Sequence, residues 1–172
     1  ECLAGVPSII LGLFGFVLFV LKLGFGWSVL SGGLTLAIMV LPIIIRTSEE
    51  AIKAVPRDYR TACYSLGMSQ WQTVTRIVLP SALPGITTGI MLSIGRSLGE
   101  TAVLLFTAGA ALRTPASVFD SGRTMAVHFY ILAREGLSMP NAYGTAAVLV
   151  ISILLINIAA YTLMQRMMKR YS

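Results

Sequence analysis

Two opposite charges lie inside an otherwise apolar stretch, and they are the residues best suited to chemistry. Arg96 and Glu100 are four positions apart, which places two side chains on one face of a helix. Counted from Pro84, Arg96 lies about 18 Å along such a helix, near the middle of a hydrocarbon core about 30 Å thick. Charges at that depth are costly and usually functional. We predict that the pair lines a solute pathway; a structural ion pair that locks helices together is the alternative.

Hydroxyl groups accompany this pair. Ser97 and Thr101 lie on the same segment, and each hydroxyl can donate a hydrogen bond. The planar fork of the Arg96 guanidinium binds phosphate or carboxylate oxygens at two points. Glu100 would repel an anion unless it holds Arg96 in place and then releases it, or carries a proton. The residue types therefore indicate an oxyanion as the solute.

The second candidate site is a polar, basic segment between apolar runs. Tyr59, Ala62, Cys63 and Leu66 follow the spacing i, i+3, i+4, i+7, which predicts a short helix with a small or apolar face. Gly67 can then take the left-handed conformation that ends a helix. This first helix should therefore stop at a tight corner.

A second short helix is predicted directly after the corner. Ser69 with Gln72 three residues later forms a capping box. Pro80 lacks an amide hydrogen, so it should stop or kink this helix as the next apolar run begins. The apolar face of the second helix consists of Trp71, Val74 and Val78. We predict an L of two short helices beside a membrane, with an ordinary helical hairpin between two spans as the alternative.

The amino-acid composition indicates the class of protein that carries these candidate residues. The chain has 172 residues, 56% hydrophobic and 12% charged, with a mean hydropathy of +0.82, which is typical of an integral membrane protein. About 20 residues span a bilayer, and runs free of charge that are about this long or longer cover 2–21, 23–45, 77–95 and 136–165. We predict one all-α domain, 1–172, with spans near 5–26, 28–46, 83–111 and 143–164, a coupling loop at 47–80 and an external loop at 112–142.

Charge distribution predicts the orientation of these spans. Thirteen Lys and Arg against seven Asp and Glu give +6, but the charges are spread through loops without interleaved aromatics, so nucleic acid is not an expected partner. Basic clusters at 46–76 and after residue 165 should be cytoplasmic. That places both ends inside and 112–142 outside. Cys2 and Cys63 should stay reduced on the cytoplasmic side, without a disulfide or a metal.

Two further helices are predicted outside the spans. Thr47 with Glu50 forms a second capping box, so a cytoplasmic helix should begin after Arg46. Residues 123–134 should form an amphipathic helix on the outer surface, with His128 on its wet side. The residues expected to face lipid or protein are Met125, Phe129 and Leu132.

The corner segment resembles the cytoplasmic loop of ABC importer permeases, whose pattern is E-A-A, three residues, G, nine residues, I, any residue, L-P. The matching residues are Ala62, Gly67, Ile77, Leu79 and Pro80. Thr61 stands in place of the pattern's Glu, and Cys63 in place of its second Ala. The glycine and Leu-Pro spacing that sets the shape of the loop is thus retained, while the carboxylate is not.

Three other stretches, Ala4–Gly15, Leu41–Ala51 and Gly95–Thr107, resemble the phosphate-specific ABC importer permeases of the PstA type. Members of that family have six spans and both ends in the cytoplasm. The resemblance implies that two amino-terminal spans are missing from this chain, which agrees with the orientation expected from charge. It also implies the type I ABC importer permease fold and a location in the plasma (inner) membrane of a bacterium or archaeon.

The resemblance further implies a permease subunit of an ATP-driven phosphate importer. Its partners would be a second permease subunit, two ATPase subunits, an external phosphate-binding protein and membrane lipid. ATP and Mg would bind the ATPase, because this chain has no G-x-x-x-x-G-K-[ST] loop; it would hold no cofactor and would not itself be an enzyme.

Carried over by position, Gly67 is the loop pivot, Ala62 and Leu66 are docking contacts, and Arg96 and Glu100 belong to the translocation path. The wider predicted docking loop adds Tyr59, Cys63, Trp71, Ile77, Leu79 and Pro80, and the path adds Ser97 and Thr101. Three alternatives remain: a permease for another oxyanion or small solute, a structural assembly subunit, and an intramembrane enzyme that uses Glu100 or His128. The last lacks a partnered nucleophile or metal set.

Overall fold

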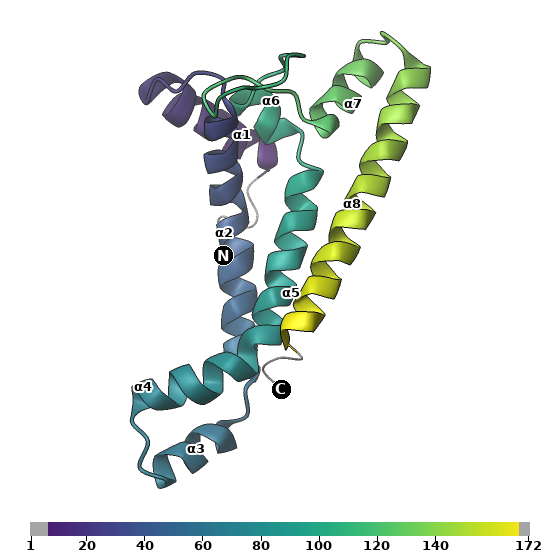
Figure 1. Ribbon diagram of the computed structural model, residues 1–172. Helices are drawn as coiled ribbons and strands as arrows, with labels where there is room; N and C mark the ends of the chain where they lie inside the picture. Colours follow the sequence, from purple (N-terminus) through teal and green to yellow (C-terminus); the bar gives the residue numbers. More distant parts are fainter. Residues whose placement is uncertain (1–6, 169–172) are drawn as a thin grey trace. The chain divides into compact units, whose positions relative to one another are not determined.

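The structure is a computed structural model that describes residues 7–168, and in that range all regular elements are helices. The predicted all-α class is therefore confirmed. The elements, labelled as in Figure 1, are α1 (Ser8–Gly15), the π-helix η2 (Phe16–Lys22), α2 (Val29–Ala54), α3 (Arg57–Ser65), α4 (Gln70–Thr73), the π-helix η3 (Val74–Val78), α5 (Leu79–Leu98), α6 (Ala102–Thr107), α7 (Met125–Arg134) and α8 (Met139–Met168).

Three helical segments of the described chain are long and apolar enough to cross a membrane: Val29–Ala54, Gln70–Leu98 and Met139–Thr162. The first predicted span is shorter than expected, because its helix covers only Ser8–Lys22. At 1.5 Å per residue that helix reaches about 22 Å, less than the about 30 Å of a hydrocarbon core. Gly24 follows it with φ +69°, a conformation that ends the helix and turns the chain.

Helix α2 continues past the point where a break was expected. The predicted capping box of Thr47 and Glu50 is wrong, because both residues lie inside the helix, which ends at Ala54. Thr47 Oγ1 donates to the carbonyl of Ile43, one turn back, at 2.9 Å, as threonine commonly does in a helix interior. Glu50 instead pairs with Arg46 on the same helix, at 3.1 Å.

The chain divides into two compact units. The first comprises the residues up to Pro42 together with Gly95–Ile156, and the second comprises Ile43–Ile94 together with the residues from Asn157 on. A buried apolar cluster in the first unit joins α6 to α7. Its buried members are Leu104, Ala108, Val127 and Ile131.

The loop between α6 and α7 supports the start of α2 within the first unit. The backbone amide of Val29 donates to the Asp120 carbonyl at 3.0 Å, and that of Leu30 donates to the Val118 carbonyl at 2.9 Å. These amides belong to the first turn of α2, where an α-helix leaves its N–H groups without partners. The long loop therefore caps a membrane helix.

Helix α7 (Met125–Arg134) confirms that a helix forms within 123–134, but its packed face differs from the predicted one. Leu132 is buried, whereas Met125 and Phe129 are exposed. The three were expected to face the same surroundings. The packed face contains Ala126, Val127, Ile131 and Leu132. His128 is half-buried, and its Nδ1 lies 3.2 Å from Nη1 of Arg123.

Candidate functional site

The first candidate site is the elbow, residues 56–80 of the second unit. Helix α3 ends in a Schellman motif: the amide of Met68 donates to the Cys63 carbonyl, and that of Gly67 donates to the Tyr64 carbonyl, both at 3.0 Å. This pattern requires a left-handed residue after the helix, and Gly67 has φ +77°. The predicted corner at Gly67 is confirmed.

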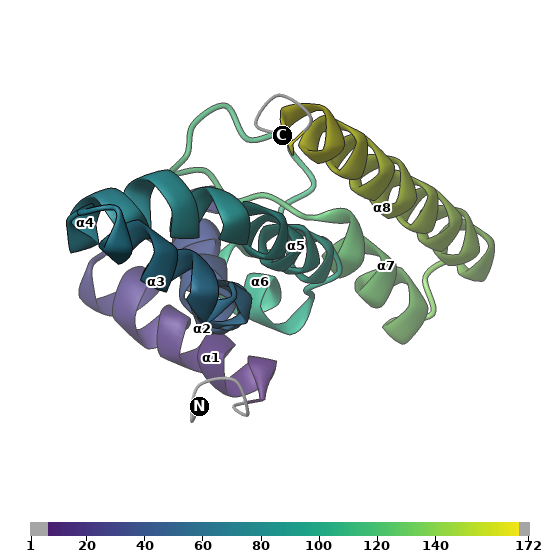
Figure 2. The ribbon, with the colours of Figure 1, turned by 90° about the horizontal axis from the view of Figure 1, so that it is seen from below.

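The second arm of the elbow begins as the sequence predicts. Ser69 Oγ accepts from the Gln72 amide at 3.3 Å, and the Gln72 side chain accepts from the Ser69 amide at 3.0 Å. This is a complete capping box. Figure 2 shows α3 lying beside α4, and the two helices are in contact. The corner is thus fixed by hydrogen bonds on both of its sides.

Pro80 does not stop the second arm. Helix α4, the π-helix η3 and α5 follow one another without an interruption, and Pro80 lies in the first turn of α5. Figure 1 shows the helical path bending between α4 and α5. A π-turn directly before a proline is a known cause of a bend, because it widens the helix where the proline offers no amide. The expected kink is present, and the expected stop is not.

The elbow presents large apolar side chains to solvent. Leu66 is 82% exposed and Trp71 is 75% exposed. The other exposed members of the predicted docking set are Tyr59, Ala62, Gly67, Leu79 and Pro80. Exposed apolar side chains on a rigid element are characteristic of a protein contact. The exposed apolar side chains of the elbow are therefore available for contact with another protein.

Not every residue of the predicted docking set lies on that surface. Cys63 is 6% exposed and Ile77 is half-buried. Helix α3 packs against α4 and η3, so part of its predicted apolar face is turned inward. Thr61, at the position of the family's Glu, donates to the Arg57 carbonyl at 3.2 Å within its own helix. Its hydroxyl therefore has a partner inside this chain.

Arg60 ties the elbow to α2, a role that the sequence pattern did not predict. Its Nη2 donates to the Ile52 carbonyl at 3.0 Å, and this carbonyl lies in the last turn of α2, where carbonyls lack helical partners. A groove of about 410 Å³ opens beside this junction. Its lining residues include Tyr59 of the elbow, together with Ala51, Ala54, Val55, Pro56, Ser81, Ala82 and Gly85.

The second candidate site is the segment that carries Arg96 and Glu100. Helix α5 ends at Leu98, and α6 begins only at Ala102. The Glu100 amide closes a tight final turn on the Ser97 carbonyl at 3.3 Å. Glu100 therefore lies outside the helix, and among the described residues neither it nor Arg96 takes part in an ion pair.

The predicted pairing of Arg96 and Glu100 along one helix face is thus not formed. The physical reason is the helix end, since i, i+4 neighbours share a face only while the helix continues. Arg96 is exposed, and Ser97, Glu100 and Thr101 are half-buried. The guanidinium is consequently available to an external partner, and the hydroxyls lie within five residues of it along the chain.

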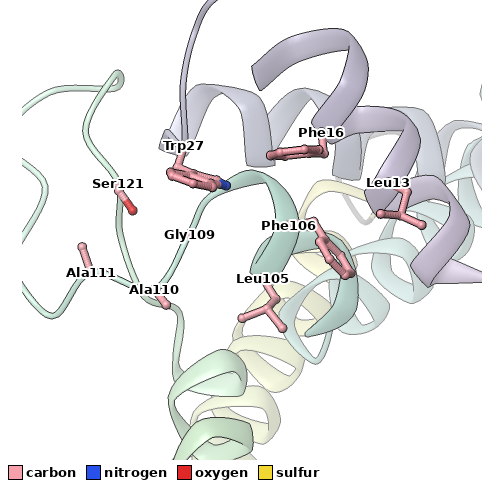
Figure 3. Close-up of a pocket in the computed structure, with 9 residues that line it drawn as sticks. All are labelled: Leu13, Phe16, Trp27, Leu105, Phe106, Gly109, Ala110, Ala111 and Ser121. Carbon is pink, nitrogen blue, oxygen red and sulfur yellow. The ribbon is translucent and has the colours of Figure 1, made fainter. Parts of the chain in front are cut away.

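A separate hollow lies in the first unit and is shown in Figure 3. It measures about 590 Å³ and is mostly apolar, with the rings of Phe16 and Trp27 stacked at 6.2 Å. The residues that line it are Leu13, Phe16, Trp27, Leu105, Phe106, Gly109, Ala110, Ala111 and Ser121. No charged side chain lines it, so it does not suit an oxyanion. Within residues 7–168 no group of His, Cys, Asp and Glu is placed to hold a metal.

The model of one family, the binding-protein-dependent transport system inner membrane component, matches residues 1–172. The chain is 40% identical to the probable ABC transporter permease protein YqgI of Bacillus subtilis, over 93% of the chain and 60% of that protein. It is 37% identical to the phosphate transport system permease protein PstA of Mycobacterium leprae, over 92% and 53%. It is also 37% identical to PstA of Xylella fastidiosa (strain Temecula1), over 96% and 58%.

The chain thus spans between 53% and 60% of the length of these relatives. No solved structure matches it.

Proposed function

The chain belongs to the family of binding-protein-dependent transport system inner membrane components, and from this membership we propose that it is the permease subunit of an ATP-driven phosphate importer. In this role it forms part of the translocation path and couples to a separate ATPase subunit, which binds ATP and Mg. The other proposed partners are a second permease subunit, a second ATPase subunit and an external phosphate-binding protein. The carboxyl terminus is proposed to be cytoplasmic.

The observation that carries this proposal is the elbow. Its sequence resembles the cytoplasmic loop of ABC importer permeases, and it exposes Leu66 and Trp71. A Schellman motif and a capping box stabilise its corner. A displacement of α3 is therefore transmitted to α4 without a change in the corner. Closure of the ATPase subunits would move the elbow, and the helices would expose the solute path to each side in turn.

Arg96 is the proposed contact for the anion. Its guanidinium is exposed at the end of a membrane helix, and a guanidinium binds phosphate at two oxygens. The interruption at Gly99–Thr101 also supports a path role, because broken helices in membrane proteins typically line a solute site. Glu100 lies beyond the end of α5 and forms no ion pair with Arg96.

Phosphate is favoured as the solute by the two relatives whose names specify phosphate transport, each 37% identical. A second candidate is a permease for another oxyanion or small solute. It is supported by the relative at 40% identity, whose name specifies ABC transport without a solute. Competition between labelled phosphate and unlabelled sulfate in vesicles separates the two.

The test replaces Arg96 with Gln in the complete transporter, reconstituted in vesicles with its ATPase and binding protein. The variant retains hydrogen-bond donors but loses the charge. We expect phosphate uptake to fall about tenfold or more, since hydrogen bonds to a charged group contribute about 1.5–3 kcal/mol, while assembly with the ATPase is unchanged. Uptake at the wild-type rate would remove Arg96 from the path.

The same experiment tests two alternative functions for the chain, a structural assembly subunit and an intramembrane enzyme. If the chain were an assembly subunit, replacing Arg96 with Gln would at most weaken the binding of partner subunits. If the chain were an enzyme, the protein would convert a substrate without taking up phosphate. Wild-type vesicles that show no ATP-dependent phosphate or sulfate uptake would contradict the transport proposal itself.

A further inference from the structure

The elbow is joined at its base by an unusually close crossing of two helices in the second unit. A Cβ built on Gly85 of α5 would lie 2.5 Å from the Cβ of Ala51 on α2. A Cβ built on Gly89 would lie 1.9 Å from Oγ1 of Thr47. Each pair is one turn from the other, so the four residues meet along one face of each helix. We call Thr47, Ala51, Gly85 and Gly89 the clamp.

The clamp continues into a buried apolar cluster. Val78 is 2% exposed, Ala82 is 3% exposed and Val55 is 6% exposed, and Ala51 of the clamp packs against them. The hydrogen bond from Arg60 to the Ile52 carbonyl adds a polar contact at 3.0 Å. Contacts from α2, α3, η3 and α5 therefore converge where the elbow leaves the two long helices.

A contact across the base of the elbow is needed because the helical path can bend near both of its ends. The elbow begins at Pro56, where α3 has no side-chain cap, and its second arm passes through the π-helix η3 just before the elbow ends at Pro80. Uncapped helix starts and π-turns are places where a helical path yields. Without a contact across the base, a displacement of the elbow would bend the chain at these two points and would not move the long helices.

We propose that the clamp makes one rigid body of the elbow and the adjoining segments Ile43–Ala54 and Leu79–Ile94, with Gly85 and Ala51 as positioning residues for coupling. This inference rests on the proposed transport function and adds the residues through which elbow motion reaches the helices. Glycine is required at position 85 because the backbone of α5 touches the side chain of Ala51. Motion of the elbow then moves both helix segments without changing the distances between them.

A size swap tests the contact. Gly85→Ala adds the clashing methyl, Ala51→Gly removes the methyl that it meets, and the double variant moves the methyl from one helix to the other. Gly33→Ala on α2 is the matched control, because a Cβ there meets no atom within 4 Å. Phosphate carried per ATP hydrolysed is measured on assembled complexes in vesicles.

We expect Gly85→Ala to lower this ratio about threefold or more, Gly33→Ala to leave it unchanged, and the double variant to recover at least half of the loss. Restoration by a second substitution marks a direct contact between the two positions. An unchanged ratio in Gly85→Ala, or a double variant no better than Gly85→Ala, would overturn the role of the clamp.

Distances in the otherwise unaltered transporter provide a test that does not depend on how the glycine variants fold. Spin labels are attached by bio-orthogonal chemistry at Glu49 on α2, Ser65 on α3 and Thr88 on α5, all of which are exposed. The proposal predicts the same three label distances before and after ATP is added. A change in any of them while phosphate is taken up refutes the rigid body; absence of uptake instead refutes the transport function.

Discussion

Gly67 offers the sharpest test of the elbow as a coupling element. Its φ is +77°, and a Cβ added to it would meet no atom within 4 Å. Replacing it with Val therefore introduces no clash, and the whole cost comes from forcing a β-branched residue into the left-handed region. That cost is about 1–2 kcal/mol, which corresponds to a change of about 5- to 30-fold in the local folding equilibrium of the corner.

A second glycine serves as a matched control. Gly136, between α7 and α8, has φ +64° and likewise meets no atom within 4 Å of an added Cβ. Gly136→Val should therefore carry a similar local backbone penalty at a site outside the elbow. Any difference in coupling between the two variants then reflects the position of the strain and not its size.

The assay is phosphate uptake and ATP hydrolysis by the reconstituted transporter. For Gly67→Val we expect hydrolysis to continue while phosphate carried per ATP falls about fivefold or more, in line with the local penalty. For Gly136→Val we expect the wild-type ratio with a comparable loss of thermal stability. Equal ratios in the two variants, or full coupling in Gly67→Val, would refute the reasoning that the corner transmits force.

Three further changes test separate parts of the structure. Ser69→Ala removes the cap of α4 and should cost about 1 kcal/mol of elbow stability, read as faster amide exchange in α4, whereas Ser69→Asn should retain the cap. Gly15→Val places a Cβ 2.2 Å from Thr35 Oγ1, so thermal unfolding should show a loss of about 1–3 kcal/mol from overpacking. The backbone amides of Ala116 and Ser117 hold the pKa of the Asp120 carboxyl below its ordinary value. Asp120 therefore stabilises the loop between α6 and α7 at pH values above the ordinary pKa of an aspartate, and this stabilisation is lost as the pH falls through the lowered pKa. Amide exchange in that loop should therefore accelerate in acid, and Asp120→Asn should abolish this pH dependence.

The corner of the elbow could be predicted from the sequence because its determinants are local. The Schellman motif at Gly67 closes over residues 63–68, and the capping box of Ser69 closes within four residues. Such motifs depend on side-chain type and spacing over one turn. The spacing of apolar residues in α3 predicted the helix for the same reason, although it did not predict that Cys63 faces inward.

The helix boundaries near the charged residues could not be predicted in the same way. Thr47 and Glu50 fit a capping box as well as Ser69 and Gln72 do, yet they lie inside α2. The two sites differ in their tertiary contacts. Thr47 packs against α5 at Gly89, and the continuation of α2 to Ala54 lets Ala51 pack, partly buried, against the cluster of Val55, Val78 and Ala82. Packing of this kind overrides a local start signal.

The amino-acid sequence by itself determined the membrane class, the helical fold and the corner of the elbow, since composition and short-range hydrogen bonds are properties of the chain alone. Tertiary structure decided which apolar residues of the elbow remain exposed, where α5 ends before Glu100, and which residues Gly85 and Arg60 meet. These features depend on pairs such as Ala51 and Gly85, which lie 34 positions apart in the sequence. Only folding brings such residues together, and their fit depends on the shapes of both helices.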